Sequence, residues 1–164
     1  MKCSGITRKI DELGRVVIPK EIRKHLGIRE GESLEIITNN DNIVLKKYSE
    51  IAKYQDMSSK LTYLIGEIYD VDIMITDREK IIASSNNYNN KRLDNKLIKY
   101  IDNRENFCSN SECRINFDNC SINGYITLYP IIDESDSIGL IIIRSNTSDD
   151  YLKLCKLIAK IIII

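Results

Sequence analysis

The chain has 164 residues, with 24 basic and 24 acidic side chains and a formal net charge of zero. This length allows one large domain or two small ones. An apolar share of 43% and a balanced charged share of 29% argue against a disordered chain. The one histidine, His25, excludes metal and phosphodiester-cleaving sites that need several histidines. Uncharged apolar runs fall short of the roughly 18 residues of a membrane-spanning helix, which predicts a soluble protein without a membrane partner.

Charge is distributed unevenly along the chain. Residues 1–29 carry eight basic and three acidic side chains, a local charge of +5. From residue 48 onward, 14 basic side chains face 17 acidic ones, a local charge of −3. Such a split is expected when one end of a protein meets a polyanion and the other does not. The N-terminal end is therefore the candidate contact surface.

Cysteine usage points to a reducing compartment. The five cysteines are Cys3, Cys108, Cys113, Cys120 and Cys155, an odd number, and the first residues lead into charged sequence without an apolar leader. We therefore expect reduced thiols and a cytoplasmic location. The central three have the spacing C-x4-C-x6-C, which is loose for zinc, so no metal and no cofactor are expected. Carboxylates such as Asp70, Asp72 and Asp77 fit turns and strand ends better than catalysis, and we expect no enzyme.

The first thirty residues predict a hairpin and a short helix. Residues 6–10 and 15–18 are strand candidates, and the segment 11–14 between them has turn residues that end in Gly14. Pro19 suits a first helical position, residues 20–26 predict two helical turns, and Gly27 suits a left-handed C-cap.

A second hairpin is predicted from residues 32–36 and 43–45, around the turn signal of residues 39–42. Four strands and one short helix in about fifty residues make a core that is marginal alone. A dimer that shares its core is the simplest physical solution, and it would double the basic surface.

A family resemblance supports this interpretation. Residues 5–23, 26–31 and 44–48, beginning Gly5-Ile6-Thr7-Arg8-Lys9-Ile10-Asp11-Glu12-Leu13-Gly14-Arg15-Val16-Val17-Ile18-Pro19, closely resemble the SpoVT/AbrB family of bacterial transition-state regulators. The resemblance implies a swapped-hairpin DNA-binding domain over residues 1–50, in which two chains interleave and present paired arginines to double-stranded DNA.

Matching positions imply the contact residues. Arg8, Arg15 and Arg23 would contact DNA, and positive surface nearby would come from Lys2, Lys9 and Lys24. Guanidinium groups neutralise phosphates and read guanine edges or narrow minor grooves. Position 24 has lysine where close relatives have arginine, so phosphate contact is expected there rather than base recognition. The alternative is that these bases form a solvated face, and we assign Lys20 to structure or weak steering.

Residues 51–55 are predicted to be a linker into a second domain, residues 56–164. Helical spacing holds from Met57 to about Asp70, strands are predicted at 71–76 and 80–84, and Leu93, Leu97, Ile98 and Ile101 mark another helix. No conformation is assigned to residues 104–123.

The last part of the chain predicts further strands at residues 125–131 and 139–144 and a helix that starts at Asp149 or Asp150. The fold class is α+β, with an antiparallel sheet and flanking helices. This order, with residues 76–85 and 130–145, resembles a divergent GAF domain. The resemblance suggests a small-molecule pocket, which could be lined by Tyr63, Tyr69, Tyr125 and Tyr129, although these tyrosines equally suit a core or an interface.

The final helix predicts assembly. Lys153, Lys156 and Lys160 trace one narrow polar stripe on an otherwise apolar helix, so its surface needs a second chain or a large ligand. The helix from Met57 is the expected partner in a bundle, and the resemblance implies a tetramer of two dimers through residues 56–164. We thus expect a DNA-binding regulator of sporulation-stage transcription. The alternatives are a metabolite sensor with an unidentified small-molecule effector and an antitoxin-type regulator.

Overall fold

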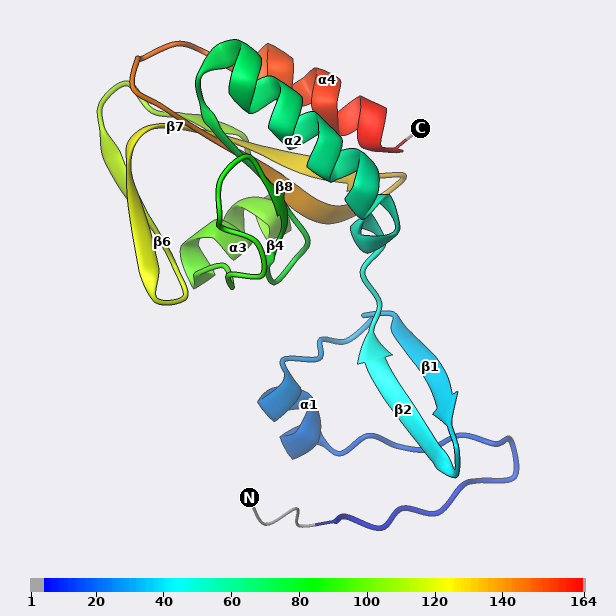
Figure 1. Cartoon of the computed structure of the whole chain (residues 1–164). Helices are drawn as coiled ribbons and strands as arrows, with labels where there is room; N and C mark the ends of the chain where they lie inside the picture. The colour runs from blue at the N-terminus through cyan, green and yellow to red at the C-terminus, as the bar shows by residue number, and fades with distance from the viewer. Residues whose placement is uncertain (1–4, 164) are drawn as a thin grey trace. The chain divides into compact units, whose positions relative to one another are not determined.

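The structure, a computed structural model, describes residues 5–163 and divides into two compact units (Figure 1). The first unit ends at Tyr48 and the second begins at Ser49. Within residues 5–163, no helix is both long and apolar enough to cross a bilayer.

The first unit contains helix α1 (Lys20–Leu26) and strands β1 (Leu34–Asn39) and β2 (Asn42–Lys47). The predicted helix over residues 20–26 is confirmed. It starts directly after Pro19 and ends at Gly27, whose φ of +63° allows the Ile28 amide to donate to the Arg23 carbonyl at 2.8 Å. The predicted second hairpin is also confirmed, with each strand longer than expected. Asn39 pairs with Asn42 around a two-residue loop in which Asn40 has a φ of +51°.

The predicted strands at residues 6–10 and 15–18 are absent from the described chain, so this part of the prediction is wrong for a single molecule. Only their connecting turn forms, with the Gly14 amide donating to the Asp11 carbonyl at 2.9 Å. A two-stranded ribbon without a packed face is marginal in water, and Ile6, Ile10, Val16 and Val17 of the two arms are exposed here. Local hydrogen bonds therefore hold the turn, while the arms remain extended and unpaired by a ladder.

The second unit contains ten elements. They are the 3₁₀ helix η1 (Ile51–Tyr54), α2 (Gln55–Tyr69), β3 (Asp72–Thr76), β4 (Ile81–Ser84), α3 (Asn95–Asn103), β5 (Phe107–Cys108), β6 (Cys113–Phe117), β7 (Cys120–Asp133), β8 (Asp136–Ser145) and α4 (Leu152–Ile163). The strands form an antiparallel sheet in the order β4-β3-β8-β7-β5, and β6 also pairs with β7. The predicted α+β class is confirmed.

The sheet is buried on both faces because apolar side chains alternate along its central strands. On β8, Ile141 and Ile143 face α2 and α4, whereas Leu140 and Ile142 face α3 and the β6–β7 hairpin (Figure 1). Each face has its own core cluster, so the second unit has three layers. Residues 51–55, which the sequence assigns to a linker, are helical, and Ile51 is fully buried in the core on the α2 and α4 side.

Candidate nucleic-acid interface

The basic residues singled out by the sequence lie on three segments of the first unit. Arg8 and Lys9 are exposed in the extended arm, Arg15 is exposed at the turn, and Lys24 is exposed on α1 beside the half-buried Arg23. Lys2 lies outside the described residues. The ion pairs described for this unit join Arg15 to Asp11 and Lys47 to Glu32, and neither acid bridges two of the proposed bases. Within a single chain, these basic side chains are therefore not joined to one another through a shared acidic partner.

Arg15 is positioned by Asp11, four residues before it. The Arg15 side chain donates from Nε to Asp11 Oδ2 at 2.7 Å, and its backbone amide donates to Oδ1 at 2.8 Å. The Leu13 amide donates to the same Oδ1 at 3.0 Å. These donors favour the charged carboxylate, and the Arg15 amide contributes most to lowering the pKa of Asp11 below its usual range. The turn thus holds Arg15 directly after Gly14, while most of that side chain stays in solvent.

Helix α1 gathers cationic groups at its C-terminal end. Arg23, Lys24 and His25 occupy the last turn, where they complement the negative end of the helix dipole, and Glu21 lies in the first turn. None of the helix residues is buried, so within one chain α1 has only a shallow contact with the rest of its unit.

The loop after α1 is fixed by a contact that sequence analysis missed. The Lys47 ammonium donates to the Gly27 carbonyl at 2.9 Å and lies 3.8 Å from the Glu32 carboxylate. Glu32 also accepts a bond of 2.8 Å from the Arg29 amide. Twenty residues separate Lys47 from Gly27, so no local signal could predict that this lysine closes the helix end rather than facing a partner.

The first unit leaves much of its apolar surface uncovered. Twelve large apolar side chains among residues 5–48 are at least 38% exposed, namely Ile6, Ile10, Leu13, Val16, Val17, Leu26, Ile36, Ile37, Ile43, Val44, Leu45 and Tyr48. They occupy the arms, the turn between them, the helix, both strands of the hairpin and the residue after β2. A soluble monomer rarely exposes so large a share of its apolar side chains, so this surface is typical of an interface.

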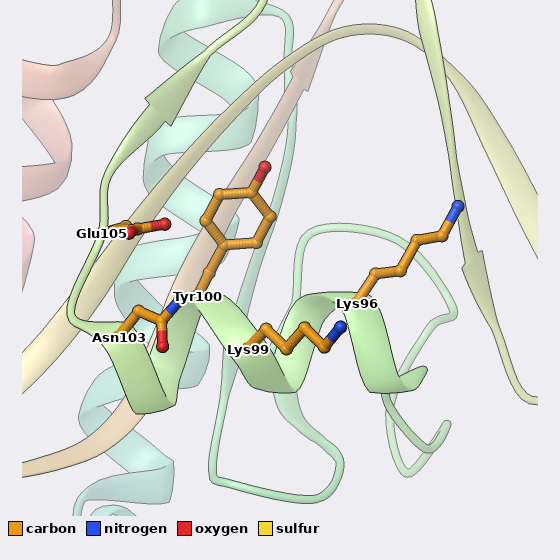
Figure 2. Close-up of a pocket in the computed structure, with 5 residues that line it drawn as sticks. All are labelled: Lys96, Lys99, Tyr100, Asn103 and Glu105. Atoms are coloured by element: carbon orange, nitrogen blue, oxygen red, sulfur yellow. The ribbon is translucent and has the colours of Figure 1, made fainter.

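The second unit has a shallow pocket on α3 and a second, polar hollow. The pocket on α3, about 300 Å³, is lined by Lys96, Lys99, Tyr100, Asn103 and Glu105 (Figure 2). None of the four tyrosines proposed from the sequence lines it. Tyr63 lines the second hollow of about 230 Å³, Tyr69 packs edge-on against Tyr151, and Tyr129 packs against the core.

The cysteines show no sign of a metal centre in the part of the chain that the structure describes. Residues 5–163 contain no group of three or more His, Cys, Asp or Glu side chains placed to hold a metal. Cys108, Cys113 and Cys120 are half-buried free thiols around β5, β6 and β7, and Cys155 is buried. Cys3 lies outside the described residues.

Comparisons with known proteins divide the chain close to the boundary between its two units. Residues 7–53 match the family model described as antidote-toxin recognition MazE, bacterial antitoxin. Residues 53–162 match that of the stage V sporulation protein T C-terminal, transcription factor.

Relatives from Bacillus subtilis (strain 168) agree. The chain is 37% identical to stage V sporulation protein T over 153 residues, covering 88% of this chain and 85% of that protein. It is 41% identical to transition state regulatory protein AbrB over 83 residues, covering 51% and 78% respectively. It is 50% identical to the putative transition state regulator Abh over 48 residues, covering 29% and 52%. With a MazE/AbrB-like N-terminal unit followed by this C-terminal domain, the chain belongs to the stage V sporulation protein T family of transcription factors.

Proposed function

We propose that the protein regulates sporulation-stage transcription by binding double-stranded DNA. Residues 1–50 form the DNA-binding domain and residues 56–164 a GAF-like domain for assembly or sensing, and residues 51–55 connect them as a helical segment packed on the second unit. The similarity to stage V sporulation protein T over 88% of the chain supports this function. We assign the protein no enzymatic activity.

The DNA contacts are proposed at Arg8, Arg15 and Arg23, with Lys2, Lys9 and Lys24 as additional positive surface. Of these, Arg8, Lys9, Arg15 and Lys24 have exposed side chains, and Arg15 is oriented by the Asp11 carboxylate. Charge supports the assignment, because the N-terminal 29 residues carry +5 while the rest of the protein is nearly neutral or acidic.

The observation that carries the proposal is the uncovered apolar surface of a strongly basic unit. The exposed side chains of the arms and hairpin need a cover, and a second copy of the same unit supplies matching apolar surface. Interleaving of two chains would give the extended arms at residues 6–10 and 15–18 their missing strand partners. It would also bring two sets of arginines onto one assembly.

An antitoxin-type function is the second candidate, because residues 7–53 match the MazE model. Antitoxin tails of that kind are expected to order only on binding a toxin. Residues 49–163 instead fold into a three-layer unit with two core clusters, which favours the transcription regulator. A metabolite-sensing regulator remains the other alternative, with the pocket on α3 as its candidate effector site.

The salt dependence of DNA binding tests the contact residues. Fluorescence anisotropy would be measured with duplexes selected from a random pool, for the wild-type protein and the Arg8→Ala, Arg15→Ala and Arg23→Ala variants. Each variant should bind more weakly, with a log-log salt slope reduced by about 0.9 for every phosphate that it no longer neutralises. Lys156→Ala, an exposed lysine on α4, is the control and should leave affinity and slope unchanged. Wild-type slope and affinity in all three arginine variants would refute the assignment.

A further inference from the structure

Ile51 is the fully buried side chain of the segment that leads into the second unit, and Tyr54 packs partly against the same core cluster. Ile51 is fully buried, and its Cδ1 lies only 2.6 Å from where a Cβ at position 139 would stand. Gly139 of β8 therefore leaves the space that Ile51 fills. The Thr76 carbonyl oxygen crowds the same position, so no side chain fits at residue 139 while this packing is intact.

The β7–β8 turn and the start of β8, which lead into Gly139, are hydrogen-bonded to residues at the C-terminal end of α3 and in the β3–β4 turn. Arg78, in the β3–β4 turn, donates from Nη1 to the Ser137 carbonyl at 2.6 Å and from Nη2 to Asp102 Oδ1 at 2.5 Å. Arg104, directly after α3, donates to the Ser135 carbonyl. Two guanidinium groups thus link Ser135 of the β7–β8 turn and Ser137 near the start of β8, two residues before Gly139, to the C-terminal end of α3.

The shallow pocket runs along α3 from Lys96 and reaches this same end of the helix. Tyr100, Asn103 and Glu105 line the pocket and alternate along the chain with Asp102 and Arg104 (Figure 2). At the other end of this connection the Ser137 hydroxyl is buried without a hydrogen-bond partner among the described residues. Buried polar groups normally form hydrogen bonds. A rearrangement here would break some hydrogen bonds but would let the Ser137 hydroxyl form one.

We propose that the packing of Ile51 against Gly139 acts as a latch. Whether this latch is seated (Ile51 packed) or released is controlled from the C-terminal end of α3 through the hydrogen bonds of Arg78 and Arg104. With the latch seated, residues 49–50 link Tyr48 of the first unit to the buried Ile51, a distance of about 7 Å when fully extended. With the latch released, the connection runs over residues 49–54, about 20 Å. Tether length sets the effective concentration of a second binding event. For two DNA sites that the shorter connection can span, a seated latch favours simultaneous binding of two DNA-binding units to one DNA, an effect that rests on the proposed function.

Hydrogen exchange in the full-length protein tests the latch without DNA. The Ala52 amide donates to the Ser49 carbonyl at 3.1 Å, and the Gln55 amide donates to the Ala52 carbonyl, so both report on η1. Exchange at these two amides should be at least tenfold faster in Ile51→Ala and in Arg78→Gln.

Two matched controls separate release from general loosening. Ile158→Ala removes a buried isoleucine from the same core cluster, on α4. Arg114→Gln removes an arginine that bonds the Ser121 hydroxyl at 2.6 Å in the β6–β7 hairpin. Both should leave exchange at Ala52 and Gln55 near the wild-type rate. If Arg78→Gln exchanges no faster than Arg114→Gln, control from the end of α3 is refuted.

Duplex length tests the consequence for DNA. Arg78→Gln should bind a duplex on which two sites lie within reach of the shorter connection about fivefold more weakly than wild type, because the connection is about three times longer, and a duplex that holds one unit equally well. Fast exchange with wild-type affinity for the long duplex would overturn the tether effect. A wild-type protein that binds neither duplex would contradict the proposed function, while the exchange measurement would still decide whether the latch exists.

Discussion

At the residue scale, the structure separates bases that are held from bases that are free to reach a partner. Arg15 is fixed by Asp11, and Lys47 closes the end of α1. Arg8 lies exposed on an extended arm. A fixed guanidinium loses less side-chain entropy on binding than one on an extended arm, so Arg15 is the best placed of these groups for a geometrically specific contact.

The Asp11 turn should show its own pH dependence. Because the folded-state pKa of Asp11 is lowered, chiefly by the Arg15 amide, its carboxylate stabilises the turn above the unfolded-state pKa. This stabilisation is lost as the pH falls through the lowered folded-state pKa. NMR titration of Asp11 should therefore show its pKa rising only part of the way in Arg15→Ala, since the backbone amide at position 15 still donates. An unchanged pKa of Asp11 in this variant would show that the side-chain pair is absent in solution.

Thiol chemistry should distinguish Cys155 from the half-buried cysteines. Burial on α4 disfavours the thiolate and raises the pKa of Cys155 to about 12. At pH 8 the thiolate fraction is then of order 10⁻⁴, so iodoacetamide should modify Cys108, Cys113 and Cys120 well before Cys155 in the native protein. Mass spectrometry of tryptic peptides measures this order, and urea-unfolded protein is the control in which Cys155 reacts like the others. Equal native rates would contradict the burial of α4 against the sheet.

At the element scale, glycine sets how closely α2 approaches the sheet. A Cβ at Gly66 would lie 2.6 Å from the Ser85 Cβ and 3.3 Å from the Val71 carbonyl oxygen. Replacing glycine with alanine in a helix ordinarily gains about 1 kcal/mol. Overpacking ordinarily costs about 1–3 kcal/mol, and here neither neighbour is the end of a flexible side chain, so the packing cost should exceed the gain.

Gly66→Ala should therefore lower the free energy of unfolding by roughly 1 kcal/mol, the excess of overpacking over helix propensity. Urea denaturation of the full-length protein measures this change. Ser59→Ala is the matched control, because residue 59 is exposed on the same helix and should alter stability by less than about 0.5 kcal/mol. A Gly66→Ala variant more stable than wild type would mean that α2 sits further from β4 than described.

Elements with a regular local pattern could be predicted from the sequence, and those that depend on distant partners could not. Alternation and caps located α1, the β1–β2 hairpin and α2, because each is determined by neighbouring residues. Strands β5 and β6 have no such pattern and form because β7 offers an edge. The strand prediction for the extended arms was wrong for the opposite reason. These segments have a strong strand propensity but no strand to pair with inside one chain.

At the scale of the whole molecule, the same distinction applies to the candidate site. The bases of the first unit could be found from charge and family resemblance. The bonds of Arg78 join it to Asp102 and Ser137, which lie 24 and 59 residues away, so no sequence signal marked them. The connection between the C-terminal end of α3 and the start of β8 is made of such long-range contacts, and only the fold reveals it.

Assembly through the second unit is the remaining prediction. The predicted lysine stripe of α4 is exposed, and Cys155, Ile158, Ala159 and Ile162 are buried against the sheet, which leaves Leu157 as the most exposed apolar residue described on that helix. Helix α2 beside it exposes Leu64 and Ile68, at 52% and 73%. Most of the uncovered apolar surface of this helical face thus belongs to α2. A second copy of the chain that packs α2 and α4 into a bundle would cover it.

Multi-angle light scattering of the full-length protein measures this assembly. The wild type should be a tetramer at micromolar concentration, and Leu64→Glu with Ile68→Glu should reduce it to the dimer held by the first unit, because two charges cannot be buried unpaired in an interface. Ile132→Glu is the control, since this exposed apolar side chain lies near the end of β7 rather than on either helix, and the change should leave the mass unaltered. A wild-type protein that is already dimeric would refute assembly through the second unit and would favour ligand sensing as the function of that unit. A double variant that stays tetrameric would instead place the interface on another face.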